Sequence, residues 1–201
     1  MTPAKRLFDI VFSVILSVVL LPLIAGVAVV ILLRDGRPIL HLSERMRTPE
    51  RAFLLLKFRT MRPDPADKGV SGGDKTARIT PTGRYLRRTR LDELPQLFNV
   101  MKGDISFVGP RPPLREYVER FPETYARVLR SRPGITGLAS ARYHEHEERL
   151  LSRSRSAGET DAIYCRSCIP RKARLDLIYQ EHRNLCLDLV LIFDTLSKPF
   201  R

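Results

Sequence analysis

Hydrophobic and polar residues divide the chain into one long apolar segment and a remainder in which short apolar stretches alternate with charged ones. The apolar segment runs from Leu7 to Leu33 and contains a single charged residue, Asp9. As a straight helix it would be about 40 Å long, against about 30 Å for the hydrocarbon core of a bilayer. It exceeds the apolar region of a signal peptide, and no small-residue cleavage site follows it. We therefore expect a membrane-associated helix.

The surroundings of this segment favour a re-entrant, hairpin-like helix over a spanning one. Pro22 interrupts the segment and removes a backbone hydrogen bond, and the halves on either side are too short to cross separately. Basic residues flank both ends, Lys5 and Arg6 before it and Arg34 and Arg37 after it. Since positive residues tend to stay cytoplasmic, both ends are expected on one side. A spanning helix remains the alternative.

The rest of the chain predicts a small, mixed, helix-rich α/β unit. We divide the protein into a membrane segment with its basic flanks, residues 1–37, and a catalytic unit, residues 38–201. The expected elements of the second unit are short strands around a turn within Ile39–Met61, a mobile loop at Asp64–Thr76, a helix starting near Asp92, a proline-rich loop at Val108–Pro113, a helix within Leu114–Leu129, a turn at Arg132–Gly134 and an amphipathic helix at Leu185–Leu196.

The last of these segments carries a regular apolar stripe. Leu185, Leu189, Ile192 and Leu196 recur at helical spacing. We interpret the stripe as the core-packing face of an ordinary helix. A membrane-surface role is the alternative, because an amphipathic helix can also lie in the lipid interface.

Charge narrows the choice of partners. Lys and Arg number 35 against 22 Asp and Glu, so the formal net charge is +13. Such an excess indicates nucleic acid, an anionic membrane surface or a phosphate-rich substrate. The basic residues around the Asp92–Glu93 and Arg111 stretches have no aromatic residues interleaved with them. This favours a phosphate ligand over stacked bases, and a basic surface that is only solvated is the alternative. These basic residues are Lys57, Arg59, Arg84, Arg87, Arg88 and Arg90. With the apolar segment, this indicates anionic lipids and phosphates, and no nucleic acid.

Cysteine content does not indicate a zinc site. Cys165 and Cys168 form a lone C-x-x-C, and Cys186 stands apart. Structural zinc needs about four ligands, and the nearby His144 and His146 are a loose complement. We interpret the run His144–Glu148 as a solvated helix start.

The strongest candidate chemistry is the acidic pair Asp92–Glu93 within LRRTRLDELPQLFNV. Leu91, Leu94, Leu97 and Phe98 recur at helical spacing and would face a core. Pro95 is comfortable only in the first turn of a helix, so we place the start near Asp92, with Asp92 as the N-cap. A carboxylate there should stay ionised, and phosphate also favours a helix start. A plain capping Asp beside a solvated Glu is the alternative.

A second candidate is Arg111 within the stretch GDISFVGPRPP. The prolines around it would hold its backbone stiff, and a guanidinium on a stiff loop suits bidentate phosphate binding. A structural turn with a surface arginine is the alternative.

Together these motifs resemble those of the monotopic phosphoglycosyl transferases, the bacterial sugar transferases. KRLFDI, LLKFRTM, LRRTRLDELPQLFNVMKGDISFVGPRPP and RPGITGLAS occur here in the order found in that family, and the resemblance covers nearly the whole chain in the family's minimal form. It implies a re-entrant membrane helix, a small α/β catalytic domain with interfacial helices, a magnesium ion and an Asp-Glu dyad.

Residue roles follow from the resemblance only at matching positions. Asp92 would be the nucleophile and Glu93 its magnesium-binding or acid–base partner, with both carboxylates as metal ligands. Arg111 would help to bind the nucleotide or its phosphates, and Arg87, Lys57 and Arg59 supply further positive charge. The chain departs from the family where Leu21 precedes Pro22, where Arg90 precedes Leu91, and after GITGLA, where Arg142 is the best match for a later arginine.

The expected reaction takes place at the cytoplasmic face of a bacterial inner membrane, as the first membrane step of glycoconjugate or exopolysaccharide synthesis. Asp92 attacks the sugar-linked phosphorus of a UDP-sugar, UMP leaves, and polyprenyl phosphate (undecaprenyl phosphate) then takes the phosphosugar. One rival is a membrane-anchored basic binding or scaffold protein without catalysis. Another is a conventional glycosyl transferase, which the absence of a D-x-D motif disfavours. The sequence leaves the sugar and the oligomeric state open.

Overall fold

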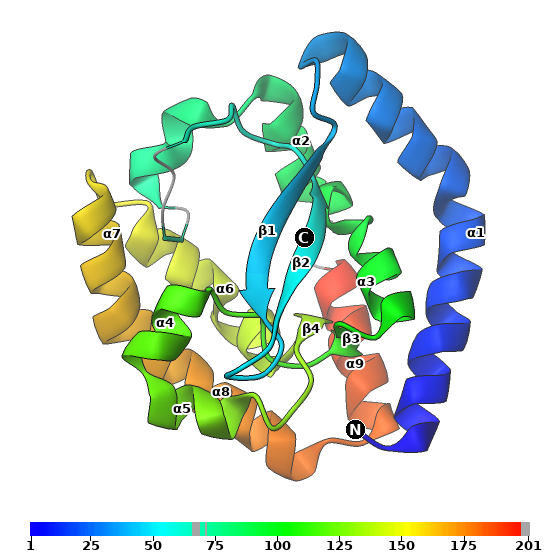
Figure 1. The fold of residues 1–201 in the computed structure, drawn as a ribbon, viewed down its shortest axis with the longest axis vertical. Helices are drawn as coiled ribbons and strands as arrows, with labels where there is room; N and C mark the ends of the chain where they lie inside the picture. Colours follow the sequence, from blue (N-terminus) through cyan, green and yellow to red (C-terminus); the bar gives the residue numbers. More distant parts are fainter. Residues whose placement is uncertain (66–68, 71, 198–201) are drawn as a thin grey trace.

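The computed structural model describes residues 1–65, 69–70 and 72–197. In these residues the protein is small, mixed and helix-rich, with one long apolar helix along an edge of a compact α/β unit (Figure 1). Its elements, in chain order, are α1 (Pro3–Arg34), β1 (Leu40–Met46), β2 (Ala52–Phe58), the 3₁₀ helix η1 (Gly73–Arg78), α2 (Pro81–Thr89), the 3₁₀ turn η2 (Leu91–Glu93), α3 (Gln96–Lys102), β3 (Ser106–Val108), α4 (Arg115–Arg120), α5 (Pro122–Val128), β4 (Gly134–Thr136), α6 (Leu138–Leu151), α7 (Ala157–Ile163), the π-helical turn η3 (Tyr164–Cys168), α8 (Ile169–His182) and α9 (Leu185–Ser197).

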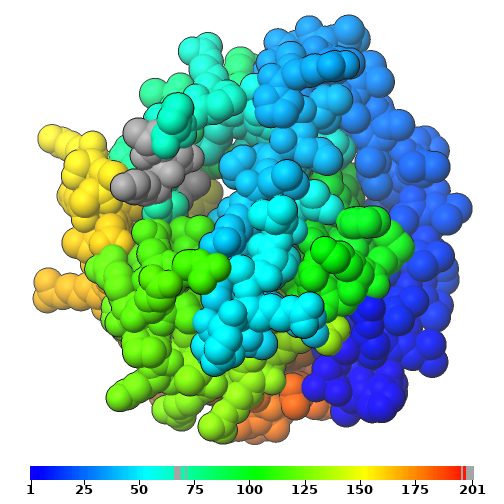
Figure 2. Space-filling model, in the orientation of Figure 1, coloured from blue at the N-terminus to red at the C-terminus, as the bar shows by residue number. Residues whose placement is uncertain are grey.

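The apolar segment forms one continuous helix, α1, of 32 residues. The side chain of Thr2 caps its start, and the helix continues through Pro22 but bends rather than running straight (Figure 1). Among the described residues, α1 is the one helix long and apolar enough to cross a membrane. Only 11% of its most apolar window is buried. Figure 2 shows α1 in blue along one edge of the molecule.

One face of α1 packs against the rest of the protein along the helix, with Leu16, Leu20 and Ile24 partly buried between its two ends. Near the start, Phe8 and Phe12 pack against Phe107 of β3, with ring centroids 6.4 and 5.1 Å from it. Toward the end, Val27 and Ile31 are buried in a cluster with Phe58 and Leu86. On its other face, Val18, Val19 and Leu21 are each more than 60% exposed. The helix is thus docked on the catalytic unit while much of its apolar surface stays uncovered.

Two small sheets organise the catalytic unit. As predicted for Ile39–Met61, β1 and β2 form an antiparallel hairpin, in which Lys57 lies opposite His41. The strands β3 and β4 pair in parallel, with Val108 opposite Thr136. The predicted helix at Leu114–Leu129 is two helices, α4 and α5, since Pro122 disfavours a helical conformation at Phe121. Within the predicted loop Asp64–Thr76, residues 66–68 and 71 lie outside the described residues.

The prediction of a helix that starts near Asp92 is wrong. Arg90 adopts a left-handed conformation (φ 58°) and ends α2, and the chain then makes the 3₁₀ turn η2 before α3 begins at Gln96. Asp92 is therefore inside a short turn and is not the N-cap, a position that Pro95 occupies instead. A 3₁₀ helix has 3.0 residues per turn, whereas an α-helix has 3.6, so the turn η2 rotates the residues that follow it relative to the predicted apolar stripe. As a result Phe98 does not face the core and is 58% exposed.

The core-facing interpretation of α9 is wrong for Leu185 and Leu189, and it is confirmed for Ile192, which is partly buried against a core cluster. Leu185 and Leu189 are 41% and 52% exposed, while Asp188 and Leu191 are buried. The side chain of Leu196 lies outside the described residues. Asp188 is drawn inward by Lys5 of α1 and Tyr179 of α8, which turns the leucine stripe outward.

Candidate active site

The acidic pair lies in the turn η2, between α2 and α3. The left-handed Arg90 starts this turn, and i→i+3 backbone bonds hold it, including Glu93 N–H to the Arg90 carbonyl at 3.2 Å. Consecutive residues in such a turn point in different directions. Asp92 and Glu93 therefore have different neighbours although they are adjacent in sequence.

Glu93 is enclosed by cations. Lys57 Nζ lies 3.0 Å and Arg111 Nη2 3.2 Å from the same oxygen, Oε1, while Arg90 Nη1 lies 3.9 Å from Oε2. Burial by itself would raise the pKa of Glu93, but Lys57 and Arg111 outweigh it and hold that pKa well below its usual range. Glu93 is therefore a permanent anion of the site, and the alternative of a solvated glutamate is wrong.

Asp92 is buried, at 7% exposure. Burial raises its pKa, the charge of Lys57 opposes the rise, and the charge of Glu93 adds to it. The expectation that a helix start keeps Asp92 ionised is thus replaced by a balance between burial and surrounding charges. Of the two carboxyls, Asp92 takes up a proton more readily, so the pair is electrically unequal.

Asn99 holds the helix after the turn against the strand that carries Lys57. Its Nδ2 donates to the Leu54 carbonyl at 2.8 Å, and its Oδ1 accepts from Leu56 N–H at 3.0 Å. One side chain thus satisfies two backbone groups of β2 and fixes the position of α3 relative to Lys57. Sequence reasoning missed Asn99, because an asparagine within a helix has no local signal for a partner more than forty residues away.

The loop that carries Arg111 is held by the backbone on both sides. Gly109 N–H donates to the Thr136 carbonyl at 2.8 Å, Gly134 N–H to the Pro110 carbonyl at 2.9 Å, and Met46 N–H to the Pro113 carbonyl at 2.9 Å. A Cβ on Gly109 would meet the Arg132 carbonyl oxygen at 2.1 Å. The loop is thus as stiff as its prolines suggested, and Arg111 reaches Glu93 from it.

The other predicted phosphate-binding arginines lie in different places. Arg87 Nε donates to Thr60 Oγ1 at 2.9 Å, and its charge lowers the pKa of Asp92 against the effect of burial. Arg59 instead donates to the carbonyls of Asp35 and Gly36, at 2.6 and 2.8 Å, and so binds the end of α1. Arg142 is exposed on α6 and lines a surface groove with residues of α9.

Two residues that sequence reasoning did not assign to the site lie close to Arg111. His144 is two positions after Arg142 and so points about 200° away around α6. Burial, followed by the charges of Arg90 and Arg111, lowers its pKa. Arg45 lies on β1 next to Met46, which bonds to the Arg111 loop. Burial, and then Arg111, lower its pKa to about 10. The H-x-H motif of His144 and His146 was a weak sequence signal for a role of His144 in the site, and no sequence pattern indicated such a role for Arg45.

The donor set is compatible with a magnesium ion that is bound together with substrate. Among residues 1–65, 69–70 and 72–197, no group of three or more His, Cys, Asp or Glu side chains could form a complete protein site. Magnesium is often held by one or two carboxylates plus substrate phosphates and water. Asp92 and Glu93 are hard oxygen donors of this kind, and Asp92 accepts no recorded hydrogen bond in the described residues that would compete.

Taken together, the geometry suits reaction at a phosphate group. A buried carboxylate lies beside a second carboxylate that is permanently charged, and the cations Lys57, Arg87, Arg90 and Arg111 outnumber the pair. The surplus positive charge can stabilise a diphosphate and the charge that develops as it is cleaved.

Comparison with known proteins agrees with the resemblance noted from the motifs. The model of the family described as bacterial sugar transferase matches residues 1–201. The chain is 34% identical over 194 residues to the uncharacterized sugar transferase EpsL of Bacillus subtilis (strain 168), covering 96% of this chain and 86% of that protein. It is also 34% identical over 202 residues to the undecaprenyl-phosphate glucose phosphotransferase of Komagataeibacter xylinus, covering 96% of this chain.

A third relative is an N-acetylgalactosamine enzyme. The UDP-N-acetylgalactosamine-undecaprenyl-phosphate N-acetylgalactosaminephosphotransferase of Aeromonas hydrophila is 33% identical over 198 residues, which cover 96% of this chain. The chain spans only 35% of the Komagataeibacter relative and 42% of the Aeromonas relative. The chain thus matches less than half the length of each of these two relatives.

Proposed function

Because this chain belongs to the bacterial sugar transferase family, we propose that it transfers a sugar phosphate from a UDP-sugar to polyprenyl phosphate, giving polyprenyl diphosphate-sugar and UMP. The observation that carries the proposal is the unequal acidic pair, Asp92 beside a Glu93 that Lys57 and Arg111 keep charged. The named relatives act on undecaprenyl phosphate, which is a polyprenyl phosphate, and support the choice of acceptor.

The first step uses Asp92 as a nucleophile. A carboxylate oxygen of Asp92 forms a bond to the sugar-linked phosphorus of the donor, the bridging P–O bond breaks, and its electron pair leaves on the phosphate of UMP. Lys57 and Arg111 are already in place around Glu93, so they can stabilise the charge of the leaving phosphate without reorganisation. The product of this step is an acyl phosphate, in which the Asp92 carboxyl is joined to the sugar phosphate as a mixed anhydride.

The second step releases the enzyme. A phosphate oxygen of the polyprenyl phosphate attacks the same phosphorus, the bond to Asp92 breaks, and Asp92 returns to a carboxylate. Glu93 stays charged throughout and orients the two cations that it binds. A magnesium ion, held by Asp92 and Glu93, would neutralise phosphate charge.

A lipid acceptor requires the enzyme to be at the membrane, and α1 is the element that would hold it there. We propose that α1 enters and leaves the membrane on the cytoplasmic side, that the exposed apolar face of α9 lies in the interface, and that anionic lipids attract the basic surface. The bend in α1 and the exposure of Leu189 and Phe193, at 52% and 75%, support this arrangement (Figure 1). The division into residues 1–37 and 38–201 stays a prediction.

A donor screen tests the proposal. The purified protein, in lipid nanodiscs with Mg²⁺, is incubated with a panel of UDP-sugars with and without undecaprenyl phosphate, and the released nucleotide is identified. We expect UMP with at least one sugar and a lipid product that carries that sugar. Release of UDP would indicate a conventional glycosyl transferase, and no released nucleotide with any donor would support a non-catalytic binding protein.

A further inference from the structure

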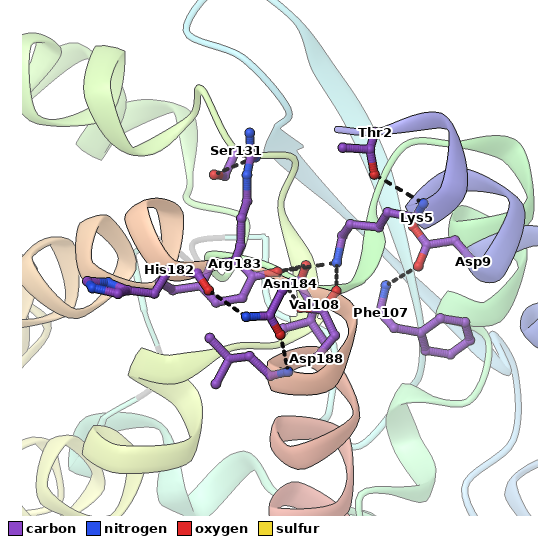
Figure 3. Close-up of polar contacts among 12 residues, drawn as sticks. Thr2, Lys5, Asp9, Phe107, Val108, Ser131, His182, Arg183, Asn184 and Asp188 are labelled. Carbon is purple, nitrogen blue, oxygen red and sulfur yellow. Dashed lines mark hydrogen bonds and ion pairs between the residues drawn. The ribbon is translucent and has the colours of Figure 1, made fainter.

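A largely buried polar junction joins the start of α1 to α8 and to the start of α9. Lys5 of α1 forms a salt bridge with Asp188 of α9, and its Nζ also donates to the hydroxyl of Tyr179 of α8 at 3.2 Å. That hydroxyl lies 2.6 Å from Asp188 Oδ1 and 3.2 Å from the carbonyl of Val108 in β3. Figure 3 shows Lys5 reaching from α1 to Asp188 beside Val108. We call Lys5, Tyr179 and Asp188 the α1 junction.

Two members of the α1 junction are buried, and the side chain of Lys5 is 13% exposed. Asp188 and Tyr179 are 2% and 1% exposed. A buried ion pair recovers the loss of hydration only when its geometry is good and its remaining hydrogen bonds are satisfied. An ion pair on the protein surface would keep its hydration and would not depend on an exact geometry. The lysine, the hydroxyl and the carboxylate therefore hold one specific arrangement of the helices that carry them.

The segment before α9 reinforces this arrangement. The side chain of Asn184 accepts from Leu187 N–H at 2.8 Å and caps the start of α9, and Arg183 donates to Ser131 Oγ at 3.3 Å. Figure 3 shows these contacts close to the α1 junction. The start of α9 is thus fixed immediately beside the start of α1.

The α1 junction connects two helices that have exposed apolar faces to the strand that precedes the loop of Arg111. Two of its helices, α1 and α9, have exposed apolar faces, whereas Val108 ends the strand that leads into the loop of Arg111. The loop itself is held by separate backbone bonds from Thr136 and Gly134. Loss of the Tyr179 hydroxyl should therefore leave the geometry around Glu93 intact and loosen only the connection to the apolar helices.

We propose that the α1 junction is a positioning device that locks α9 to α1 and β3, and so fixes the height of the acidic pair above the lipid surface. Tyr179 is its central positioning residue, since its hydroxyl contacts Lys5, Asp188 and the carbonyl of Val108. The inference rests on the proposed function, because only a lipid acceptor requires a defined height. The motif KRLFDI then has a second role besides its charge: its lysine docks the membrane helix.

The native thiol of Cys186, which is exposed at the start of α9, provides a test that does not depend on activity. A nitroxide is attached to Cys186 in a Cys165→Ala background, and its mobility and depth are measured in nanodiscs of phosphatidylglycerol and phosphatidylcholine. Tyr179→Phe should increase the mobility of the label and change its depth. Tyr143→Phe is the matched control, because Tyr143 is also buried and its hydroxyl donates to the Ser167 carbonyl at the same 3.2 Å, outside the α1 junction.

Kinetics give the second measurement. Tyr179→Phe should raise the KM for polyprenyl phosphate about tenfold, as expected for the loss of buried hydrogen bonds, with the KM for the UDP-sugar unchanged. Asp188→Asn should act in the same direction on the label and on the lipid KM. Should it fail to fold, Tyr179→Phe decides. A Cys186 label with wild-type depth and mobility in Tyr179→Phe would overturn the proposal. A wild-type protein that releases no UMP would refute the proposed function, while the label would still decide the role of the α1 junction.

Discussion

The acidic pair and the membrane helix are unfavourable in water for opposite reasons. Around Glu93 the protein buries charges, which costs hydration, and it compensates with cations at 3.0 and 3.2 Å. Along α1 it exposes large apolar side chains and provides nothing to cover them, with Val18 at 69% exposure. In a soluble enzyme the first region would be ordinary and the second a liability. Their combination indicates a protein whose chemistry involves phosphate and whose second partner is lipid.

The largest expected effect is at the charged region. Asp92→Asn keeps the shape of the side chain but makes it a far poorer nucleophile, so turnover should fall about 1,000-fold or more. Incubation of the wild-type protein with a UDP-sugar, without lipid, should add one sugar phosphate to its intact mass, and the variant should show no such adduct. The modified residue is then mapped by peptide mass spectrometry.

A matched carboxylate separates chemistry from general charge. Asp161→Asn changes a half-buried acid that pairs with Arg120 at 2.9 Å, and it should leave both turnover and adduct formation at wild-type levels. A wild-type enzyme that turns over normally without ever forming an adduct would remove Asp92 from the nucleophilic role and leave it as a metal ligand.

A smaller loss of activity is expected for a change at Arg111, which binds Glu93 from the proline-rich loop. Arg111→Lys retains charge but loses the planar fork, so kcat/KM should fall about 10- to 100-fold, the value of one or two charge-assisted hydrogen bonds. Steady-state kinetics measure it, with Arg115→Lys as the control, since Arg115 pairs with Glu44 on an exposed surface. Wild-type kinetics in Arg111→Lys would mean that the loop is structural.

The apolar region is tested by its topology. In inside-out vesicles, single cysteines at positions 2 and 37 should react equally with a membrane-impermeant maleimide, because basic residues flank both ends of α1 and favour one side. Labelling of only one of the two positions would establish a spanning helix. That result would change the account of α1 without affecting the acidic pair.

The smallest effect is on stability and concerns the buried carboxyl of Asp176, which, unlike Glu93, is not paired with cations in the described part of the chain. Oδ1 of Asp176 is buried without a hydrogen-bond partner in the described residues, and Lys172 bonds to Glu147 at 2.8 Å instead. Burial raises the pKa of Asp176 to about 7. In an unfolded chain that pKa is about 3.9, so the folded state holds the extra proton, and the stability it contributes is lost as the pH rises from about 4 to 7.

The corresponding variant should remove this pH dependence. Asp176→Asn is expected to raise the free energy of unfolding at pH 8 by at most about 4 kcal/mol, which corresponds to about 2–4 °C in Tm for each kcal/mol. Thermal unfolding in detergent at pH 5 and pH 8 measures it, and the gain should fall to about 1.5 kcal/mol at pH 5, which lies only about one unit above the pKa of the unfolded carboxyl. Glu181→Gln, on the exposed side of α8, is the control. An equal gain at both pH values would contradict the assignment.

Local sequence patterns determined the elements of this protein but not how they meet. The apolar run, the strand pair within Ile39–Met61 and the stiff loop of Arg111 were predictable, because each depends on hydrophobic length, alternation or proline within a few residues. The start of the helix after Asp92 was not. It depends on the left-handed Arg90 and on the strand that Asn99 binds, and neither leaves a periodic signal.

The sequence by itself determined that the protein has an apolar segment long enough to cross a membrane, an excess of basic residues and an Asp-Glu pair in a motif typical of bacterial sugar transferases. Only the tertiary structure decided which charges surround that pair, that Arg59 binds the end of α1, and that Asp188 rather than the leucine stripe of α9 points inward. The physical reason is that composition and periodicity report the cost of exposing a side chain to water. Whether a buried charge is compensated depends on partners such as Lys5 and Asp188, which are 183 residues apart in the chain.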